Sequence, residues 1–298
     1  MNPPTNTPTN TPTNRPIDRA NNMATSKPLN PAIDKPINEP ANQQADMPDH
    51  VTENQPAHEP SGQPMSDHRT RFLQLALRAQ ALRFGEFTLK SGRSSPYFFN
   101  AGRFDSGAVL AELAGCYADA IDAHVVAGTG AGLEFDLLFG PAYKGIPLAT
   151  ALACEYAGRG RDLPLAFNRK EAKAHGEGGS LIGAPLAGRR VLIVDDVITA
   201  GTAIREALGI IAAAGGRVAG IVIALDRQEV AGGAEITATA TTTRRSAAET
   251  VAHEHALPVI AIASLEDLLG FADQHPDLAD LRGRLLAYRD AYGCGASL

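Results

Sequence analysis

The stretch RVLIVDDVITAGTAIREA, residues 190–207, decides the fold of this chain. Its residues 191–194 are all branched and apolar. Such a run, without polar alternation, predicts a strand that is buried on both faces of a parallel sheet. The strand ends in two adjacent carboxylates, Asp195 and Asp196, so we expect acidic side chains at the carboxyl edge of that sheet.

A short loop and a helix follow this strand. The loop, residues 199–202, consists of small and hydroxylated residues, and the helical pattern places Ile204, Leu208 and Ile211 on one face. Two glycines at 215–216 end the pattern. Strand, loop and helix together predict an α/β unit, a class of fold in which ligands bind beyond the carboxyl ends of the strands.

The loop has the composition of a phosphate site. A helix N-terminus offers free backbone N–H groups and the positive end of its dipole, and Gly201 lets the main chain approach a ligand closely. The carboxylates would repel a phosphate. They suit the hydroxyl groups of a ribose, which can donate hydrogen bonds to them, or a metal ion. The string VLIVDD alone is a weak signal, since a solvated acidic strand end or a receiver-type phosphoacceptor site begins in the same way.

The complete string DDVITAGTA resembles the phosphoribosyl pyrophosphate (PRPP) motif of the type I phosphoribosyltransferases. The resemblance implies that the paired aspartates hold the 2′- and 3′-hydroxyls of the ribose and that the loop cradles the 5′-phosphate. The PRPP-binding residues that it implies here are Asp195, Asp196, Val197, Ile198, Thr199, Ala200, Gly201, Thr202 and Ala203.

Residues 1–65 differ in composition from the rest of the chain. They are rich in Pro, Asn and acidic residues, open with a TNTP repeat and have almost no apolar periodicity. Such a segment buries too little apolar surface to offset its ordering entropy, so we predict a disordered extension that is neither a secretory signal nor a transit peptide; Met65 is an alternative start. Residues 66–298 predict one domain, with a hood at about 66–103 and a core at about 104–298.

Charge and cysteine content limit the kinds of ligand and the cellular compartment that we expect for this protein. The formal net charge of −6 argues against general affinity for nucleic acid or an anionic membrane, and no apolar run is long enough to span a bilayer. The three cysteines lie far apart without metal-ligand spacing, which fits a reduced compartment. We therefore expect a cytoplasmic protein whose ligands are small molecules.

A second stretch, FGEFTLKSGRSSPYFFNAG at residues 84–102, predicts short strands joined by the turn SGRSSP. An ordinary hairpin with a buried aromatic pair is one interpretation. The motif also resembles the N-terminal hood of the bacterial-type orotate phosphoribosyltransferases, in which Lys90 would contact PRPP and the pair Phe98 and Phe99 would line the orotate pocket. Arg227, at the end of a predicted buried strand, would bind the orotate carboxylate, a task that suits a planar guanidinium. The orotate-binding residues implied by the resemblance are Phe98, Phe99, Thr199 and Arg227.

Two cationic motifs extend the resemblance. The motif GPAYKGIP places Tyr143 and Lys144 at a strand-to-helix turn, where a solvated lysine is one interpretation. The resemblance implies that this pair contacts PRPP. The second motif, RKEAKAHGEGG at residues 169–179, combines cations with flexible glycines. This composition suits a mobile lid that neutralises the charge on a leaving pyrophosphate. The alternative is a charged face exposed to solvent. The run matches the family's catalytic loop, in which Lys173 and His175 would reach the neighbouring subunit's site. The resemblance implies PRPP binding by Arg169, Lys170, Lys173 and His175, and catalytic roles for Lys170, Lys173, His175, Asp195 and Asp196.

Periodicity predicts the remaining elements. Helices are expected from a cap at Ser66 or Asp67 to Gly85, at 105–123, after 144 and at 250–256, and two short helices at the end of the chain. Strands are expected at 135–141, 163–168, 219–229 and 258–264, and a Gly-rich surface loop at 124–132.

The chain is thus identified as a member of the bacterial-type orotate phosphoribosyltransferases. The resemblance implies the type I phosphoribosyltransferase fold, a central and mostly parallel sheet flanked by helices with a small N-terminal hood. It also implies transfer of ribose 5-phosphate from PRPP to orotate in pyrimidine biosynthesis, Mg²⁺ that PRPP carries to the site, and a homodimer with shared active sites. The alternatives are another phosphoribosyltransferase, or a regulator of this fold that binds nucleic acid; the set of hood residues with Arg227 argues against a purine enzyme.

Overall fold

A six-stranded sheet organises the protein, in the order β5-β4-β3-β6-β7-β8. The computed structural model describes residues 67–89, 92–126, 133–170, 181–230, 245–275 and 278–294. The strands are β3 (Leu137–Gly140), β4 (Leu165–Asn168), β5 (Leu181–Gly183), β6 (Arg190–Asp195), β7 (Arg217–Asp226) and β8 (Val259–Ser264). All neighbouring strands are parallel except β5, which runs antiparallel to β4. The predicted mostly parallel sheet is therefore confirmed.

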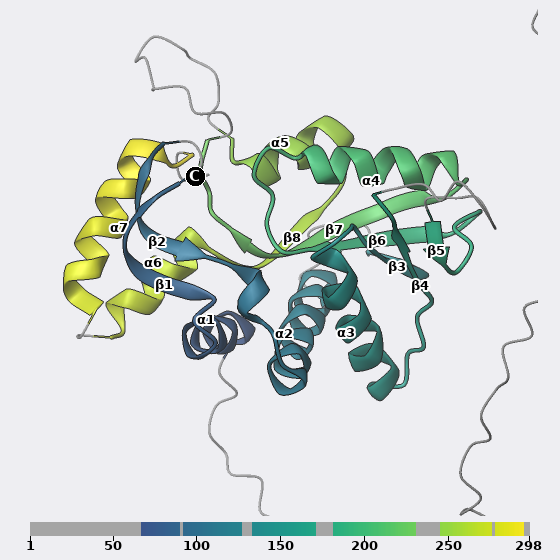
Figure 1. Ribbon diagram of the computed structural model, residues 1–298, viewed down its shortest axis with the longest axis horizontal. Coiled ribbons are helices and arrows are strands. Elements are labelled where there is room, and N and C mark those ends of the chain that lie inside the picture. The colour runs from purple at the N-terminus through teal and green to yellow at the C-terminus, as the bar shows by residue number, and fades with distance from the viewer. Residues whose placement is uncertain are drawn as a thin grey trace, which may run out of the picture. The chain divides into compact units, whose positions relative to one another are not determined.

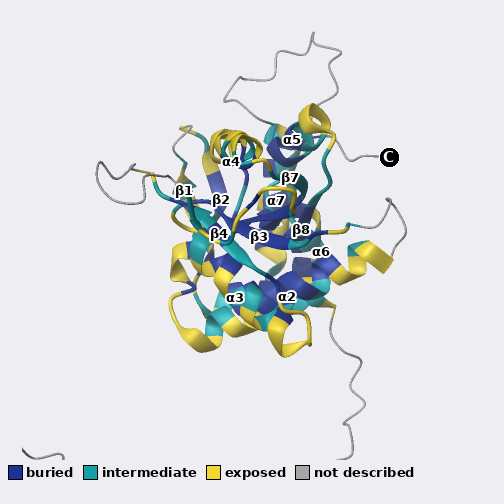
Figure 2. Ribbon diagram, turned by 90° about the vertical axis from the view of Figure 1, so that its right-hand side faces the viewer, coloured by how far each residue is buried: buried dark blue, intermediate teal, exposed yellow. Residues whose placement is uncertain are grey.

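Helices cover both faces of this sheet (Figure 1). One face carries α1 (His68–Arg78), α2 (Gly107–Val126), α3 (Gly145–Gly158) and α6 (Leu265–Asp273), and the other carries α4 (Thr202–Ala213) and α5 (Ala247–His255). In Figure 2 the buried strands lie between helices whose outer sides are exposed. None of the helices in the described ranges combines the length and apolar character that a membrane crossing requires.

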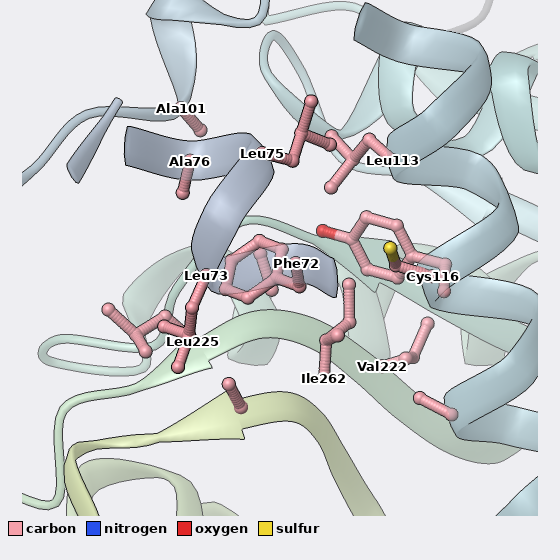
Figure 3. Close-up of a cluster of buried hydrophobic side chains, with 14 of the residues drawn as sticks. Phe72, Leu73, Leu75, Ala76, Ala101, Leu113, Cys116, Val222, Leu225 and Ile262 are labelled. Carbon is pink, nitrogen blue, oxygen red and sulfur yellow. The ribbon is translucent and has the colours of Figure 1, made fainter. Parts of the chain in front are cut away.

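Strand β6 supplies side chains to two separate cores. Leu192 and Val194 belong to the core under α1, α2 and α3, whereas Val191 and Ile193 belong to the core under α4 and α5. This division follows from the alternation of side chains along a strand, and it explains the uninterrupted apolar run in the sequence. In Figure 3, Phe72 of α1 packs among residues of α2, β7 and β8. Each large side chain buried in this way contributes about 1.5–3 kcal/mol relative to exposure.

The predicted hairpin forms a separate two-stranded sheet, in which β1 (Leu82–Thr88) pairs with β2 (Ser94–Phe99). The C-terminal helix α7 (Ala279–Tyr292) packs against it. Arg284 donates a hydrogen bond to the Gly85 carbonyl at 2.6 Å, and the Tyr97 and Tyr288 rings meet edge to face. Strand β2 and helix α7 lie far apart in sequence, so the C-terminal helix covers part of the segment that was predicted to be the hood.

Several predicted boundaries were wrong. The first helix ends at Arg78, and Leu82 begins strand β1, because pairing with β2 outweighs the helical spacing of the apolar residues. Asp67 precedes that helix without capping it through its side chain. Helix α2 continues to Val126, into the predicted loop, and α7 is longer than expected. The edge strand β5 was not predicted, since three residues carry too little pattern.

Candidate active site

The topology of the sheet defines where a ligand binds. From β3 the chain crosses through α3 to β4 on one side, and from β6 it crosses through α4 to β7 on the other. The loops after β3 and β6, which are neighbours in the sheet, therefore lead away in opposite directions. Ligands of open α/β sheets bind at this switch point, beyond the carboxyl ends of the strands.

The carboxylates Asp195 and Asp196 lie at this point and are almost completely buried, with 7% and 6% of their surface exposed. Their main chain is held from two sides. The Tyr117 hydroxyl donates to the Asp195 carbonyl at 2.8 Å, and the Ala224 amide donates to the Asp196 carbonyl at 2.9 Å. Lys144, from the loop after β3, places its Nζ 2.7 Å from Asp196 Oδ2. The switch point thus joins two of the predicted PRPP motifs.

Burial and the neighbouring Asp196 charge raise the pKa of Asp195 well above the usual range of a carboxyl group. The Asp196 backbone N–H donates to Asp195 Oδ1 at 2.9 Å and offsets part of this effect. One cation, Lys144, is bound to the pair. The acidic pair is therefore suited to hydroxyl donors or a further cation, which would relieve the repulsion between its members.

The loop after Asp196 is anchored by two apolar side chains. Val197 is partly buried against one core and Ile198 is buried in the other, so Ile198 can reach a ligand only through its main chain. The next residues, Thr199 and Ala200, are exposed. Gly201 precedes α4 with φ of 72°, a left-handed conformation that favours glycine. The loop thus delivers the free N–H groups of the α4 N-terminus to the switch point.

Arg205, in the first turn of α4, holds the loop after Asp196 in place. Its Nη1 donates to the Ala200 carbonyl at 2.8 Å, and its Nη2 pairs with Glu254 of α5 at 2.8 Å. The sequence analysis assigned no role to this residue. The sequence did contain a signal for this role, because an arginine one turn into the helix that follows a predicted phosphate loop can reach back to that loop.

The loop after β3 packs unusually close to the start of α3. A Cβ atom on Gly140 would lie 2.4 Å from the Gly145 carbonyl oxygen, and a Cβ atom on Gly145 would lie 2.7 Å from the Val194 carbonyl oxygen. Both positions therefore require glycine. The Ala142 amide donates to Asn168 Oδ1 at 2.9 Å, and the peptide bond after Ala142 is cis. Tyr143 is exposed, with Lys170 Nζ 5.4 Å from the centre of its ring. Buried Asn168 was missed, although a polar residue at the end of a buried strand could have indicated it.

The predicted orotate-binding residues Arg227, Phe98 and Phe99 lie at the end of β7 and on strand β2 of the hairpin. The guanidinium of Arg227 lies over the Tyr97 ring of β2, 4.6 Å from its centroid. Phe98 packs with Phe87, whereas Phe99 packs with Phe72 in the core. The two phenylalanine rings point to opposite faces of the hairpin, so only one of them can present its ring to a given pocket.

The structure brings most of the predicted site residues to one edge of the sheet. Segments 142–144, 168–170, 195–203 and 226–227 follow four neighbouring strands that all end there. The predicted residues Lys90, Lys173 and His175, and most of the cationic loop, lie outside the described residues. Within the described ranges, no group of three or more His, Cys, Asp or Glu side chains could hold a metal ion.

The comparisons with known proteins agree with this geometry. A model of the phosphoribosyl transferase domain matches residues 109–253. An orotate phosphoribosyltransferase of Xanthomonas campestris pv. campestris (strain B100) is 74% identical over 229 residues, which cover 77% of this chain and 98% of the relative. The chain belongs to the orotate phosphoribosyltransferase family. A family member from Stenotrophomonas maltophilia (strain K279a) is 69% identical over the same shares of both chains.

Solved structures of the orotate phosphoribosyltransferases extend the likeness to the fold. The crystal structure of the Francisella tularensis enzyme matches with a TM-score of 0.62 and 38% identity, over 74% of this chain and 98% of that one. The type I phosphoribosyltransferase fold predicted from the sequence is thereby confirmed.

Proposed function

We propose that this protein is the enzyme that transfers ribose 5-phosphate from PRPP to orotate, giving orotidine 5′-phosphate and pyrophosphate in pyrimidine biosynthesis. The observation that carries the proposal is the acidic pair Asp195 and Asp196 beside the N-terminus of α4, at the switch point of a sheet that belongs to this family. The proposal uses the acidic pair for the ribose hydroxyls and the N-terminus of α4 for the phosphate.

The reaction needs positioning and electrostatic stabilisation. The anomeric carbon of the ribose becomes cation-like as pyrophosphate leaves, and the mechanism calls for no protein nucleophile. We assign the ribose hydroxyls to Asp195 and Asp196, and the 5′-phosphate to residues 199–203. We assign the pyrophosphate of PRPP to Tyr143, Lys144 and Lys170. By resemblance, we assign Lys90, Arg169, Lys173 and His175 to PRPP, with catalytic roles for Lys170, Lys173 and His175.

We expect Mg²⁺ to reach the site bound to PRPP. The donor set fits this role, since Asp196 is already paired with Lys144 and no group of three or more potential metal ligands was found in the described part of the chain. Mg²⁺ favours substrate phosphate oxygens and water over an all-protein cage. When bound, the ion would neutralise charge on the leaving pyrophosphate, while Asp195 and Asp196 orient the ribose.

We assign the orotate carboxylate to Arg227, and the base to Thr199 and the predicted hood hairpin. The opposite directions of Phe98 and Phe99 mean that one ring and the strand's main chain would contact the base. We further propose a homodimer in which the loop at 169–179 serves the partner's site, and a cytoplasmic location, which the free cysteines favour.

An absorbance assay tests the proposal against its alternatives. Orotate consumption should require PRPP and Mg²⁺, and hypoxanthine and adenine should not replace orotate. Consumption of a purine instead would identify another phosphoribosyltransferase. A folded protein that is inactive with all three bases would favour a regulator of this fold, which the family relationship makes the weaker alternative.

A further inference from the structure

Arg227 is held in place by two residues to which the sequence analysis gave no role. Its side chain and that of Glu229 are 13% and 16% exposed. Arg227 Nε donates to Glu229 Oε1 at 2.8 Å, and Nη2 lies 2.6 Å from the same oxygen without the alignment of a hydrogen bond. The hydroxyl of Tyr288, a buried residue of α7, donates to that oxygen at 2.8 Å. A single carboxylate oxygen thus links the arginine to the C-terminal helix.

The main chain around Glu229 is fixed to the end of the same helix. The Cys294 amide donates to the Gln228 carbonyl at 2.9 Å, and the Val230 amide donates to the Tyr292 carbonyl at 3.0 Å. Glu229 itself forms an isolated bridge with Gly293. The main chain that carries the Glu229 carboxylate is therefore fixed to the C-terminal helix, and Tyr288 holds the carboxylate itself.

A buried guanidinium needs a partner, since an uncompensated charge in this environment is strongly unfavourable. Besides the Glu229 carboxylate, the guanidinium of Arg227 would have to bind the carboxylate of orotate. Whether it can do so depends on the orientation of its planar group of N–H donors. We propose that Glu229 and Tyr288 are positioning residues for orotate: Tyr288 fixes Glu229, and Glu229 holds Arg227 in the orientation that meets the orotate carboxylate. The C-terminal helix is thereby part of base recognition. This inference rests on the assignment of orotate to Arg227 in the proposed function.

The substitution Tyr288→Phe removes the hydroxyl and keeps the ring that packs against Tyr97. The KM for orotate should rise about three- to tenfold, as is typical when a contact that acts through another residue is lost. The kcat and the KM for PRPP should stay within about twofold. Tyr292→Phe is the matched control, because it lies on the same helix and holds Val230 through its main chain; it should leave both KM values unchanged. A purely structural role would instead lower the melting temperature and alter both KM values together.

Glu229→Gln keeps the shape and removes the charge, so it should also raise the KM for orotate selectively. A lower KM for orotate would show that Glu229 competes with the substrate for Arg227, and would overturn the inference. Unchanged orotate KM values in folded Tyr288→Phe and Glu229→Gln proteins would overturn it as well.

Arg227→Gln separates this inference from the proposed function. If that folded variant keeps the wild-type KM for orotate, the orotate subsite is misplaced and the inference fails with it. If it loses orotate binding while the other two variants do not, the subsite stands and only the positioning role is refuted.

Discussion

Asp195 and Asp196 occupy an environment that is unfavourable for two carboxylates in the free protein. Both are buried at the end of β6, and Lys144 is the cation that pairs with Asp196 among the residues that the structure describes. Such an arrangement makes sense if the substrate's hydroxyls, and the metal ion that accompanies it, complete the environment. The residues that we propose to bind the ribose are therefore also expected to lower the stability of the free protein.

The substitution Asp196→Asn should leave the fold intact and lower turnover about ten- to a thousandfold, because it removes one group that aligns the ribose and holds Lys144. The assay is orotate consumption with PRPP and Mg²⁺, with circular dichroism to verify the fold. Asp162→Asn, at an exposed position before β4, is the control and should be fully active. Near-normal turnover of a folded Asp196→Asn protein would show that the ribose assignment is wrong.

Asp195 should make stability depend on pH. Burial, with the charge of Asp196, raises its pKa to about 7 in the folded protein. The folded state thus binds more protons than the unfolded state between the ordinary carboxyl pKa and neutrality, so this group's contribution to stability falls as the pH rises through that range. Asp195→Asn should therefore stabilise the free protein at pH 8, by a free energy of unfolding on the order of 2 kcal/mol.

Denaturant unfolding of both proteins from pH 4.5 to 8 measures this effect. The advantage of Asp195→Asn should shrink toward the acidic end of the range. A variant that is less stable than the wild type at pH 8 would contradict the strained environment of Asp195.

At the scale of the element, the N-terminus of α4 depends on Gly201. A Cβ there would lie 3.0 Å from Arg205 Nη1 and 3.1 Å from Val251 Cγ2, and the residue has φ of 72°. Gly201→Ala should reduce stability by about 1–2 kcal/mol, the cost of a left-handed conformation for a residue with a side chain. It should also raise the KM for PRPP, because the phosphate loop must shift.

Gly209, in the same helix, is the matched control. A Cβ at this position meets nothing within 4 Å, and Ala is a better helix former than Gly. Gly209→Ala should therefore raise stability by roughly 0.5–1 kcal/mol with unchanged KM for PRPP. Equal effects of the two substitutions on KM would argue against a phosphate site at the start of α4.

At the scale of the whole molecule, the extension and the dimer remain to be tested. A chain that begins at Met65 should keep its melting temperature and its activity, because the composition of residues 1–64 offers no apolar face to dock on the domain. Thermal melting and the orotate assay on the shortened protein are the measurements. A lower melting temperature or lost activity would show that the extension packs on the domain.

The shared site can be tested by mixing two inactive variants, Lys173→Ala and Asp196→Asn, under conditions that exchange subunits. In a mixed dimer, one site would combine an intact acidic pair with an intact loop, and the other would carry both defects. Random pairing makes about half of the dimers mixed, so roughly a quarter of the wild-type sites should return. If mass spectrometry confirms exchange and activity stays at the level of the separate variants, each loop serves its own subunit.

The sequence alone determined the parts of the site that are contiguous in the chain. Strand β6, the acidic pair, Gly201 and helix α4 follow one another within residues 190–213, so apolar pattern, loop composition and helix periodicity were sufficient to place them. The hairpin and the parallel strands were predicted for the same reason, since each is a local pattern of apolar residues and turn residues.

The tertiary structure decided what local patterns cannot encode. Lys144 meets Asp196 across 52 residues of sequence, and Asn168 supports Ala142 across 26. The end of the first helix, the separation of Phe98 from Phe99 and the packing of α7 on the hood all depend on pairing between distant segments. Such contacts form only when the sheet brings its strands together, because the free energy of burial and pairing then outweighs local preference. The sequence therefore specified the chemical groups of this site, and the fold decided which of them face one another.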